Sequence, residues 1–307
     1  MIKLKKPKTS ILSKMVLALA MFGLVQSVAN AQELTGTLAK IKNSGVIVVG
    51  HRESSIPFSY FDNNQQVIGY SQDYSNLIVD AVKKELNMPN LKVKYLPVTS
   101  KTRIALLNNN TYDFECGSTS NNLTRQQFAD FSNTIFIAGT RFLVNANSNI
   151  NSIDDLKGKN VVTTAGTTTE IRLHKLNDEK DLKMRIITPK DNSDAFYILE
   201  SERAVAFVLD DPLLAGERSR AINPKDWKIV GEPLSYESYA CMLRKDDKQF
   251  KQLIDKTIAK AQKSGQALTS YNKWFTQPVP PNGTNLELTI SPEMEALFAN
   301  PNDQALN

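Results

Sequence analysis

The strongest constraint on the fold is an alternation of strand-like and helix-like patterns along most of the chain. Residues 46–50 form an apolar β-branched run, residues 71–86 carry apolar side chains at helical spacing, and residues 91–96 alternate like a strand. The order recurs later, with strands expected at 160–164, 185–187 and 204–209 and helices at 168–177, 193–202 and 211–220. This alternation predicts an α/β fold with mostly parallel sheets covered on both faces.

The first 31 residues have the pattern of a targeting segment. Five lysines precede an apolar run at 15–25, and VANA at 28–31 forms a small-x-small cleavage site before Gln32. The apolar run is too short to span a bilayer comfortably, and no lipid-attachment cysteine stands near Ala31. We therefore expect a cleaved signal peptide at 1–31 and export of a free protein to the periplasm.

The net positive charge of the whole chain comes from this leader. Five of the 37 Lys and Arg residues and none of the 32 Asp and Glu residues lie in it, so the rest of the chain carries 32 of each. No basic block of the kind that binds a phosphate backbone remains. A nucleic-acid partner is therefore not expected.

The remaining chain is long enough for two lobes. About 276 residues follow the leader, which exceeds the usual size of one domain. Near the end, the Pro-rich connection at 278–284 precedes Met294, Leu297 and Phe298 at helical spacing, which predicts a last packed helix.

Export also bears on Cys116 and Cys241, the only two cysteines. An oxidising compartment lets such a pair form a disulfide, and the alternatives are two separate buried thiols or a metal site. The metal site is the least favoured, because the only histidines, His51 and His174, are far from both cysteines in sequence and show no ligand spacing. The two histidines also lack a nucleophile beside them.

The stretch DFECGSTSNNLTR at 113–125 has the residues of a carboxylate-binding site. Hydroxyl residues 118–120 follow Gly117 on a predicted turn, and Arg125 offers a planar fork that can bind a carboxylate bidentately. The other interpretation is a hydroxyl-rich turn that caps a helix starting near Thr124.

Polar residues also follow other predicted strands, where ligands bind in open α/β sheets. Taken singly they have plain explanations: arginines are commonly solvated, and Thr167 or Asp211 could cap the next helix. Taken together they are complementary in charge and predict one ligand site. They are Arg52, Ser100, Arg103, Gly166, Thr167, Thr168 and Asp210.

Several segments together resemble the periplasmic solute-binding proteins of amino-acid ABC importers, and among them the glutamate/aspartate-binding proteins. The likeness spans nearly the whole chain after the leader. The segments are VIVVGHRESS at 46–55, GYSQDYS at 69–75, DFECGSTSNN at 113–122, FVLDDPLLAG at 207–216 and CMLRKDD at 241–247.

This resemblance implies a two-lobed clamshell with two hinge crossings, placed near 134–141 and 231–239. Lobe 1 would comprise 32–138 and 232–307, and lobe 2 would comprise 139–231, so both cysteines would lie in lobe 1. The resemblance also implies a monomer without a cofactor or enzymatic activity, with L-glutamate or L-aspartate and the membrane permease of an ABC importer as partners.

The ligand chemistry follows from what a zwitterionic amino acid requires. An α-ammonium group needs a carboxylate and acceptor oxygens, for which we expect Asp210 and Ser118. An α-carboxylate needs a guanidinium group and donors, for which we expect Arg125 and Ser120. Further donors from the opposite lobe would come from a helix start at Gly166, Thr167 and Thr168.

Specificity is expected to come from the surplus of positive charge. Arg52 and Arg103, with Ser100, match positions that hold the side-chain carboxylate in binders of acidic amino acids. Related proteins carry a histidine where this chain has Asn192; an amide still donates a hydrogen bond but cannot become charged at mildly acidic pH. The alternatives are a binder of a neutral or amide amino acid, a clamshell enzyme of the dehydratase type, and a binder that serves signalling only.

Overall fold

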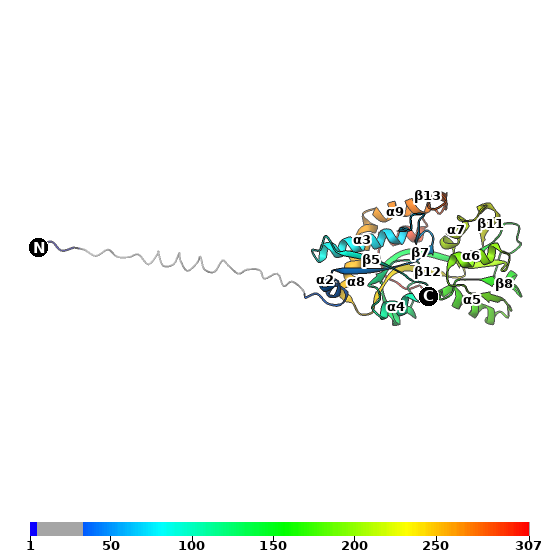
Figure 1. The fold of residues 1–307 in the computed structure, drawn as a ribbon, viewed down its shortest axis with the longest axis horizontal. Coiled ribbons are helices and arrows are strands. Elements are labelled where there is room, and N and C mark those ends of the chain that lie inside the picture. Colours follow the sequence, from blue (N-terminus) through cyan, green and yellow to red (C-terminus); the bar gives the residue numbers. More distant parts are fainter. Residues whose placement is uncertain (5–32, 307) are drawn as a thin grey trace. The chain divides into compact units, whose positions relative to one another are not determined.

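Strand β7 (Ala129–Asn145) runs through both parts of the main sheet and links them (Figure 1). Its first half pairs antiparallel with β12 (Tyr236–Arg244), and its second half pairs antiparallel with β10 (Ala206–Asp210) and β11 (Trp227–Val230). The computed structural model describes residues 1–4 and 33–306. The signal peptide predicted at 1–31 therefore lies outside the described residues except for its first four.

The first lobe, as we call the part around the first half of β7, has the strand order β5-β1-β6-β12-β7. Strand β1 (Val46–His51) pairs parallel with both β5 (Lys92–Pro97) and β6 (Phe114–Glu115). Its helices are α2 (Gly36–Ser44), α3 (Tyr70–Glu85), α4 (Arg103–Asn108), α8 (Lys248–Lys263), α9 (Gln266–Phe275) and α10 (Pro292–Ala299). Its smaller elements are β2 (Ser54–Ser55), β3 (Ser59–Phe61), β4 (Val67–Ile68), β13 (Pro278–Val279), β14 (Thr284–Asn285) and the 3-10 turn η1 (Arg125–Gln127).

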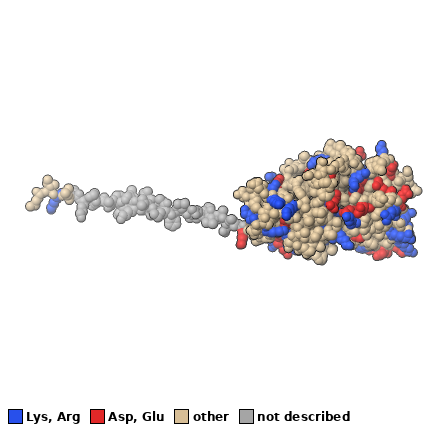
Figure 2. Space-filling view, viewed as in Figure 1, with Lys and Arg blue, Asp and Glu red and all other residues tan. Residues whose placement is uncertain are grey.

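The second lobe surrounds the other half of β7. Strand β8 (Asn160–Val162) pairs parallel with both β9 (Arg185–Ile187) and β10. The helices are α5 (Thr168–Glu179), α6 (Asn192–Glu200) and α7 (Asp211–Arg218), with 3-10 turns η2 (Asp154–Leu156) and η3 (Pro224–Asp226). On the face shown in Figure 2, acidic and basic side chains mingle on this lobe.

Each lobe has its own apolar core. Phe142, Val161, Leu173 and Val208 belong to a buried cluster built only from second-lobe residues. A separate cluster in the first lobe includes Leu107, Tyr112, Phe131 and Met242. Two cores joined by long strands give the two-lobed α/β fold that was predicted. In the main sheet, β1, β5 and β6 pair parallel in the first lobe, and β8, β9 and β10 pair parallel in the second.

Two chain segments connect the lobes side by side. The first is β7 itself, and the second is the stretch at 231–235 that leads from β11 into β12. The N–H of Thr140 donates to the carbonyl of Ser235 at 2.9 Å, and the N–H of Leu234 donates to the carbonyl of Thr140 at 2.8 Å. The predicted pair of hinge crossings is therefore present.

The predicted elements appear within a few residues of their expected bounds, and α10 buries Met294, Leu297 and Phe298 as expected. No element was predicted for residues 248–275, where the structure has α8 and α9, although a capping residue and helical apolar spacing were present in the sequence. The side chain of Asp247 accepts a hydrogen bond from the N–H of Phe250 and caps α8, which buries Phe250, Ile254 and Ile258 at a spacing of four residues.

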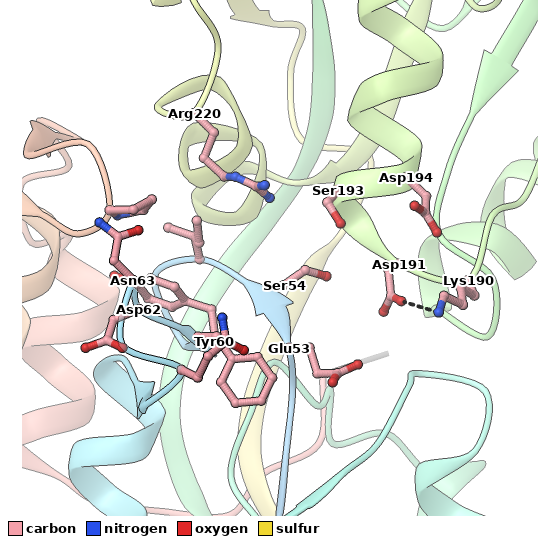
Figure 3. A pocket seen from close by; sticks show the side chains of 14 residues that line it. Glu53, Ser54, Tyr60, Asp62, Asn63, Lys190, Asp191, Ser193, Asp194 and Arg220 are labelled. Carbon is pink, nitrogen blue, oxygen red and sulfur yellow. Dashed lines mark ion pairs between the residues drawn. The ribbon is translucent and has the colours of Figure 1, made fainter.

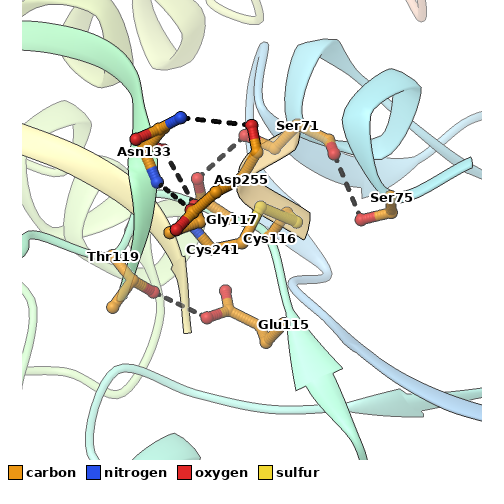
Figure 4. Close-up of a disulfide and its surroundings, with 10 residues drawn as sticks. Ser71, Ser75, Glu115, Cys116, Gly117, Thr119, Asn133, Cys241 and Asp255 are labelled. Carbon is orange, nitrogen blue, oxygen red and sulfur yellow. Dashed lines mark hydrogen bonds between the residues drawn. A yellow bond between two sulfur atoms is a disulfide. The ribbon is translucent and has the colours of Figure 1, made fainter. Parts of the chain in front are cut away.

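The disulfide prediction is confirmed, since Cys116 and Cys241 are joined with an Sγ–Sγ distance of 2.07 Å (Figure 4). The register explains the pairing. Strand β6 aligns Glu115 with Met242 of β12 in antiparallel pairing, so the residues next to them face each other. The alternatives of free thiols and a metal site are thereby excluded, and the bridge lies in the first lobe.

Candidate functional site

The predicted site residues follow the ends of strands from both lobes. Arg52 comes directly after β1, Ser100 and Arg103 come after β5, and Ser118 and Ser120 come after β6. In the second lobe, residues 166–168 lead from β8 into α5, and Asp210 ends β10. Because β1, β5 and β6 are parallel, their carboxyl ends meet at one edge of the first-lobe sheet.

Arg52 is a buried arginine with hydrogen-bonding capacity to spare. Its side chain is 1% exposed; Nη1 donates to Oγ of Ser100 at 3.0 Å, and Nη2 lies 3.9 Å from Oδ1 of Asp191 in the second lobe. Within the described residues, its Nε and Nη2 have no hydrogen-bond partner. Burial, and then the charge of Arg103, lower the pKa of Arg52 to about 10, which leaves it charged at neutral pH.

Arg103 is the first residue of α4 and is also buried, at 2% exposure. Its Nη1 donates to the carbonyl of Ser118 at 3.3 Å and to the hydroxyl of Thr119. Its Nε has no partner in the part of the chain that the structure describes. The two arginines thus present unused donors in a region closed to solvent.

Asn192 adds a fourth donor of the same kind. The hydroxyl of Thr164 donates to Oδ1 of Asn192 at 2.8 Å, which fixes the amide so that Nδ2 is the free end. Among the described residues this buried Nδ2 has no acceptor. Asn192 follows Asp191, the residue that approaches Arg52. The four spare donors are what an anionic group would require at this end of the site.

Arg125 connects the two lobes at the other end of the site. Its Nη1 donates to the carbonyl of Ser120 at 3.1 Å, and its Nη2 donates to the carbonyl of Gly166 at 3.3 Å. The hydroxyls of Ser120 and Thr168 lie 3.5 Å apart. Burial lowers the pKa of Arg125 to about 9. The structure therefore brings together the residues expected around the α-carboxylate.

The start of α5 supplies fewer free donors than expected. The hydroxyl of Thr167 accepts from the N–H of Glu170 at 3.0 Å and donates to the carbonyl of Thr164 at 2.7 Å, so it caps the helix. The N–H of Gly166 donates to Oε2 of Glu170 at 2.7 Å. The hydroxyl of Thr168, beside Ser120, is the better placed donor of this segment.

Asp210 is held by two residues that the sequence analysis did not select. Its Oδ1 accepts from the hydroxyl of Thr140 at 2.8 Å, and its Oδ2 accepts from the phenol of Tyr239. Burial, with the charge of Glu237 adding to it, raises the pKa of Asp210 to about 7. Thr140 lies on the crossing strand β7, Tyr239 lies on β12 just after the second crossing, and the backbone of Tyr239 also pairs with that of Ser120. Asp210 therefore sits between the hinge and the turn after β6.

One interpretation of the sequence was that Asp211 caps α7, and the structure contradicts it. It is the first residue of that helix, the N-cap is Asp210, and no side chain closes the cap. Oδ1 of Asp211 instead accepts from the N–H of Gly139 on β7 at 3.1 Å. Asp211 thus binds the crossing strand next to Asp210.

A pocket of about 520 Å³ opens beside the Arg52 end of the site (Figure 3). Both lobes line it, with Glu53, Ser54 and Tyr60 on one side and Asp191, Asp194 and Arg220 on the other. Asp191 belongs to this pocket and is also the residue near Arg52. The pocket therefore borders the cluster of spare donors.

The two histidines differ in burial and lie on different lobes. His51 is buried, packs edge-on against Phe61 with ring centres 5.2 Å apart, and has its Nδ1 3.1 Å from the carbonyl of Arg52. Burial lowers its pKa. His174 lies on the exposed face of α5. Within residues 1–4 and 33–306, no group of three His, Cys, Asp or Glu could hold a metal ion, and no helix is long and apolar enough to cross a membrane.

Residues 47–277 match the family model of the bacterial extracellular solute-binding proteins, family 3. The chain belongs to this family. It is 57% identical over 300 residues to the glutamate/aspartate import solute-binding protein of Salmonella typhimurium, covering 96% of this chain and 99% of the relative. It is 54% identical over 276 residues to the L-glutamate/L-aspartate-binding protein of Pseudomonas aeruginosa, covering 90% and 91%.

The fold is also similar to solved structures. A mutant of ArgBP from T. maritima superimposes with a TM-score of 0.69 at 26% identity, covering 78% of this chain and 99% of that one. The likeness supports the two-lobed arrangement of a solute-binding protein.

Proposed function

We propose that this protein captures L-glutamate and L-aspartate in the periplasm and delivers them to the membrane permease of an ABC importer. Its family and the names of its relatives support this assignment. Removal of the leader at 1–31 would release the protein as a soluble monomer. Lobe 1 would comprise residues 32–138 and 232–307, and lobe 2 residues 139–231.

In the proposed complex the α-ammonium group binds Asp210 and Ser118. The α-carboxylate binds Arg125 and Ser120, with Thr168 and the backbone at 166–167 closing over it from the second lobe. The side-chain carboxylate binds at the opposite end of the site, to Arg52, Ser100, Arg103 and Asn192.

The observation that carries this proposal is that four of the buried N–H donors without hydrogen-bond partners in the described chain belong to three residues of this site: Nε and Nη2 of Arg52, Nε of Arg103 and Nδ2 of Asn192. Buried donors cost free energy when unpaired. A side-chain carboxylate would accept from them and offset the two buried positive charges, whereas a neutral amide would bring a second donor group to a region that needs acceptors. The proposed role is binding without chemical conversion of the ligand.

Calorimetry of the protein without its leader, with L-glutamate, L-aspartate, L-glutamine and L-arginine, tests the proposal. We expect both acids to bind with a low micromolar Kd or tighter, which corresponds to at least about 8 kcal/mol. The ligand should be recovered unchanged. Binding of glutamine or arginine ten times tighter than either acid would contradict the assignment, and turnover of the ligand would favour the enzyme alternative.

A further inference from the structure

Glu115 is a buried acid next to Arg52 and Arg103. It takes no part in the proposed ligand contacts. It ends β6, is 0% exposed, and precedes the disulfide-bonded Cys116 (Figure 4). Its Oε2 accepts from the hydroxyl of Thr119 at 2.7 Å. Within the described residues its Oε1 has no hydrogen-bond partner. A carboxylate in such a place is costly unless nearby positive charge compensates for it.

Two contacts connect Glu115 to the arginine pair. The hydroxyl oxygen of Thr119 that donates to Glu115 also accepts from Nη1 of Arg103, so one hydroxyl joins the acid to the guanidinium group. A Cβ built on Gly117 would overlap Oε1 of Glu115 and would lie 3.2 Å from Cγ of Arg52. The acid and the stem of Arg52 therefore flank the same point of the backbone.

The other acid near the pair is differently placed. Oδ1 of Asp191 lies 3.9 Å from Nη2 of Arg52, but its Oδ2 lies 3.6 Å from Nζ of the exposed Lys190, which offsets its charge. Glu115 forms no ion pair with an exposed cation in the part of the chain that the structure describes, and its charge acts on Arg52, on Arg125 and on the buried His51. The two guanidinium groups and the fully buried Glu115 together carry a net charge of about +1, which one side-chain carboxylate would neutralise.

We propose that Glu115 is a positioning residue that sets the charge of the acidic-ligand subsite: through Thr119 it holds Arg103, and its negative charge limits the attraction of Arg52 and Arg103 for an anion. The inference rests on the proposed function, since it concerns the subsite for a side-chain carboxylate. It makes Glu115 a determinant of the preference for acids over amides, although Glu115 does not touch the ligand.

The experiment compares Glu115→Gln with the matched control Glu217→Gln. Glu217 is 1% exposed and also has one oxygen without a hydrogen-bond partner in the described chain, but it lies on α7 beside Arg220, and burial raises its pKa to about 8. Glu217→Gln therefore controls for placing a buried amide on the protein and not for the loss of a charge. In Glu115→Gln the amide oxygen can still accept from Thr119, so the negative charge is removed while this hydrogen bond is kept. We expect the ratio of the Kd for glutamine to the Kd for glutamate to rise about fivefold or more, because only the anion is relieved of repulsion. The ratio in Glu217→Gln should match that of the unmodified protein. An unchanged or smaller ratio in Glu115→Gln would overturn the proposal.

A second measurement examines the link through Thr119. Thr119→Val removes the hydroxyl and should weaken glutamate binding about tenfold, and more than glutamine binding, whereas Thr119→Ser should restore both. Failure of Thr119→Ser to restore binding would contradict the positioning role.

The unliganded protein gives a readout that does not depend on ligand identity. The melting temperature of Glu115→Gln should fall below that of Glu217→Gln, because only Glu115→Gln removes the counter-charge of the two buried guanidinium groups. If the unmodified protein failed to prefer glutamate over glutamine, the proposed function would be wrong, while this melting comparison would still decide the role of Glu115 as counter-charge. Equal melting temperatures would overturn that role.

Discussion

Gly166 of the second lobe lies against the backbone of Lys101 in the first. A Cβ built on Gly166 would lie 2.6 Å from both the Cα and the N of Lys101, closer than side chains approach backbone atoms. Its carbonyl meanwhile accepts from Arg125. The lobes can therefore meet around the site only because this position has no side chain.

Gly166→Ala should weaken glutamate binding about tenfold or more, because the closed arrangement of the lobes would need a backbone shift. The matched control is Gly158→Ala. Gly158 has a φ of +72°, similar to the +77° of Gly166, but a Cβ there would meet nothing within 4 Å. Both variants should lose about 1 kcal/mol of stability from backbone strain, and only Gly166→Ala should lose affinity in calorimetry. Equal affinities for the two variants would contradict the steric argument.

Binding should depend on pH through Asp210, whose pKa burial raises to about 7. The ligand ammonium group favours the ionised acid, so binding below pH 7 must displace a proton. Affinity should therefore fall about tenfold between pH 8 and pH 6, with proton release measurable by calorimetry in two buffers of different ionisation enthalpy. Asp210→Asn should remove this pH dependence and weaken binding by about 2 kcal/mol or more.

The raised pKa of Asp210 affects folding stability in the opposite direction: a rise in pH strengthens ligand binding but lowers the free energy of unfolding. Between about pH 4 and pH 7 the folded protein retains the Asp210 proton that the unfolded chain has lost, so this group makes the free energy of unfolding fall as the pH rises through that window. Denaturant titrations of the unliganded protein and of Asp210→Asn at pH 5 and pH 7.5 measure the difference. A pH profile shared by both proteins would mean that Asp210 does not titrate in this range.

The three arginines should differ in their effect on ligand choice. Arg52→Ala and Arg103→Ala should raise the Kd for glutamate about 30-fold or more, with a much smaller effect on glutamine, because only the acid loses a charged partner. Arg125→Ala, at the α-carboxylate end, should weaken both ligands about equally. Measuring both ligands on all three variants in one buffer gives an internal control, and equal losses throughout would refute acidic specificity at Arg52 and Arg103.

Removing the disulfide should destabilise the first lobe. Replacing Cys116 and Cys241 by serine in one variant should lower the free energy of unfolding by about 2 to 5 kcal/mol, because the bridge restricts the unfolded chain. Urea unfolding of the variant and of the oxidised and reduced protein measures the change. The reduced protein and the variant should agree, and a midpoint unaffected by reduction would contradict the prediction.

Local patterns in the sequence were sufficient for most elements of the fold. Strand and helix periodicities predicted the alternation around β8, β9 and β10, and the apolar spacing at 294–298 predicted α10. The candidate loops could be selected because ligand sites in such sheets gather after strand ends. The geometry brings together Arg125, Ser120 and Gly166 as expected, and their role in binding stays a prediction.

The residues that the sequence analysis missed act across the sheet. Thr140 and Tyr239 hold Asp210 from β7 and β12, and that contact depends on where two distant strands meet, which no local spacing reveals. Glu115 could not be distinguished from a surface acid, because its burial follows from the pairing of β6 with β1 and β12. The hydroxyl of Thr167 caps α5 by accepting from the backbone N–H three residues later; a threonine just before a predicted helix was visible in the sequence but was weighed as one of two alternatives.

The bond between Cys116 and Cys241 closes a covalent ring across a sequence separation of 125 residues. All of β7 to β11 and α5 to α7 lie inside that ring. A protease that cuts one peptide bond anywhere in the second lobe would therefore leave both fragments attached, and the nicked protein would separate only under reducing conditions. The second lobe is thus a segment whose two ends remain tethered to the first lobe even when its own backbone is broken.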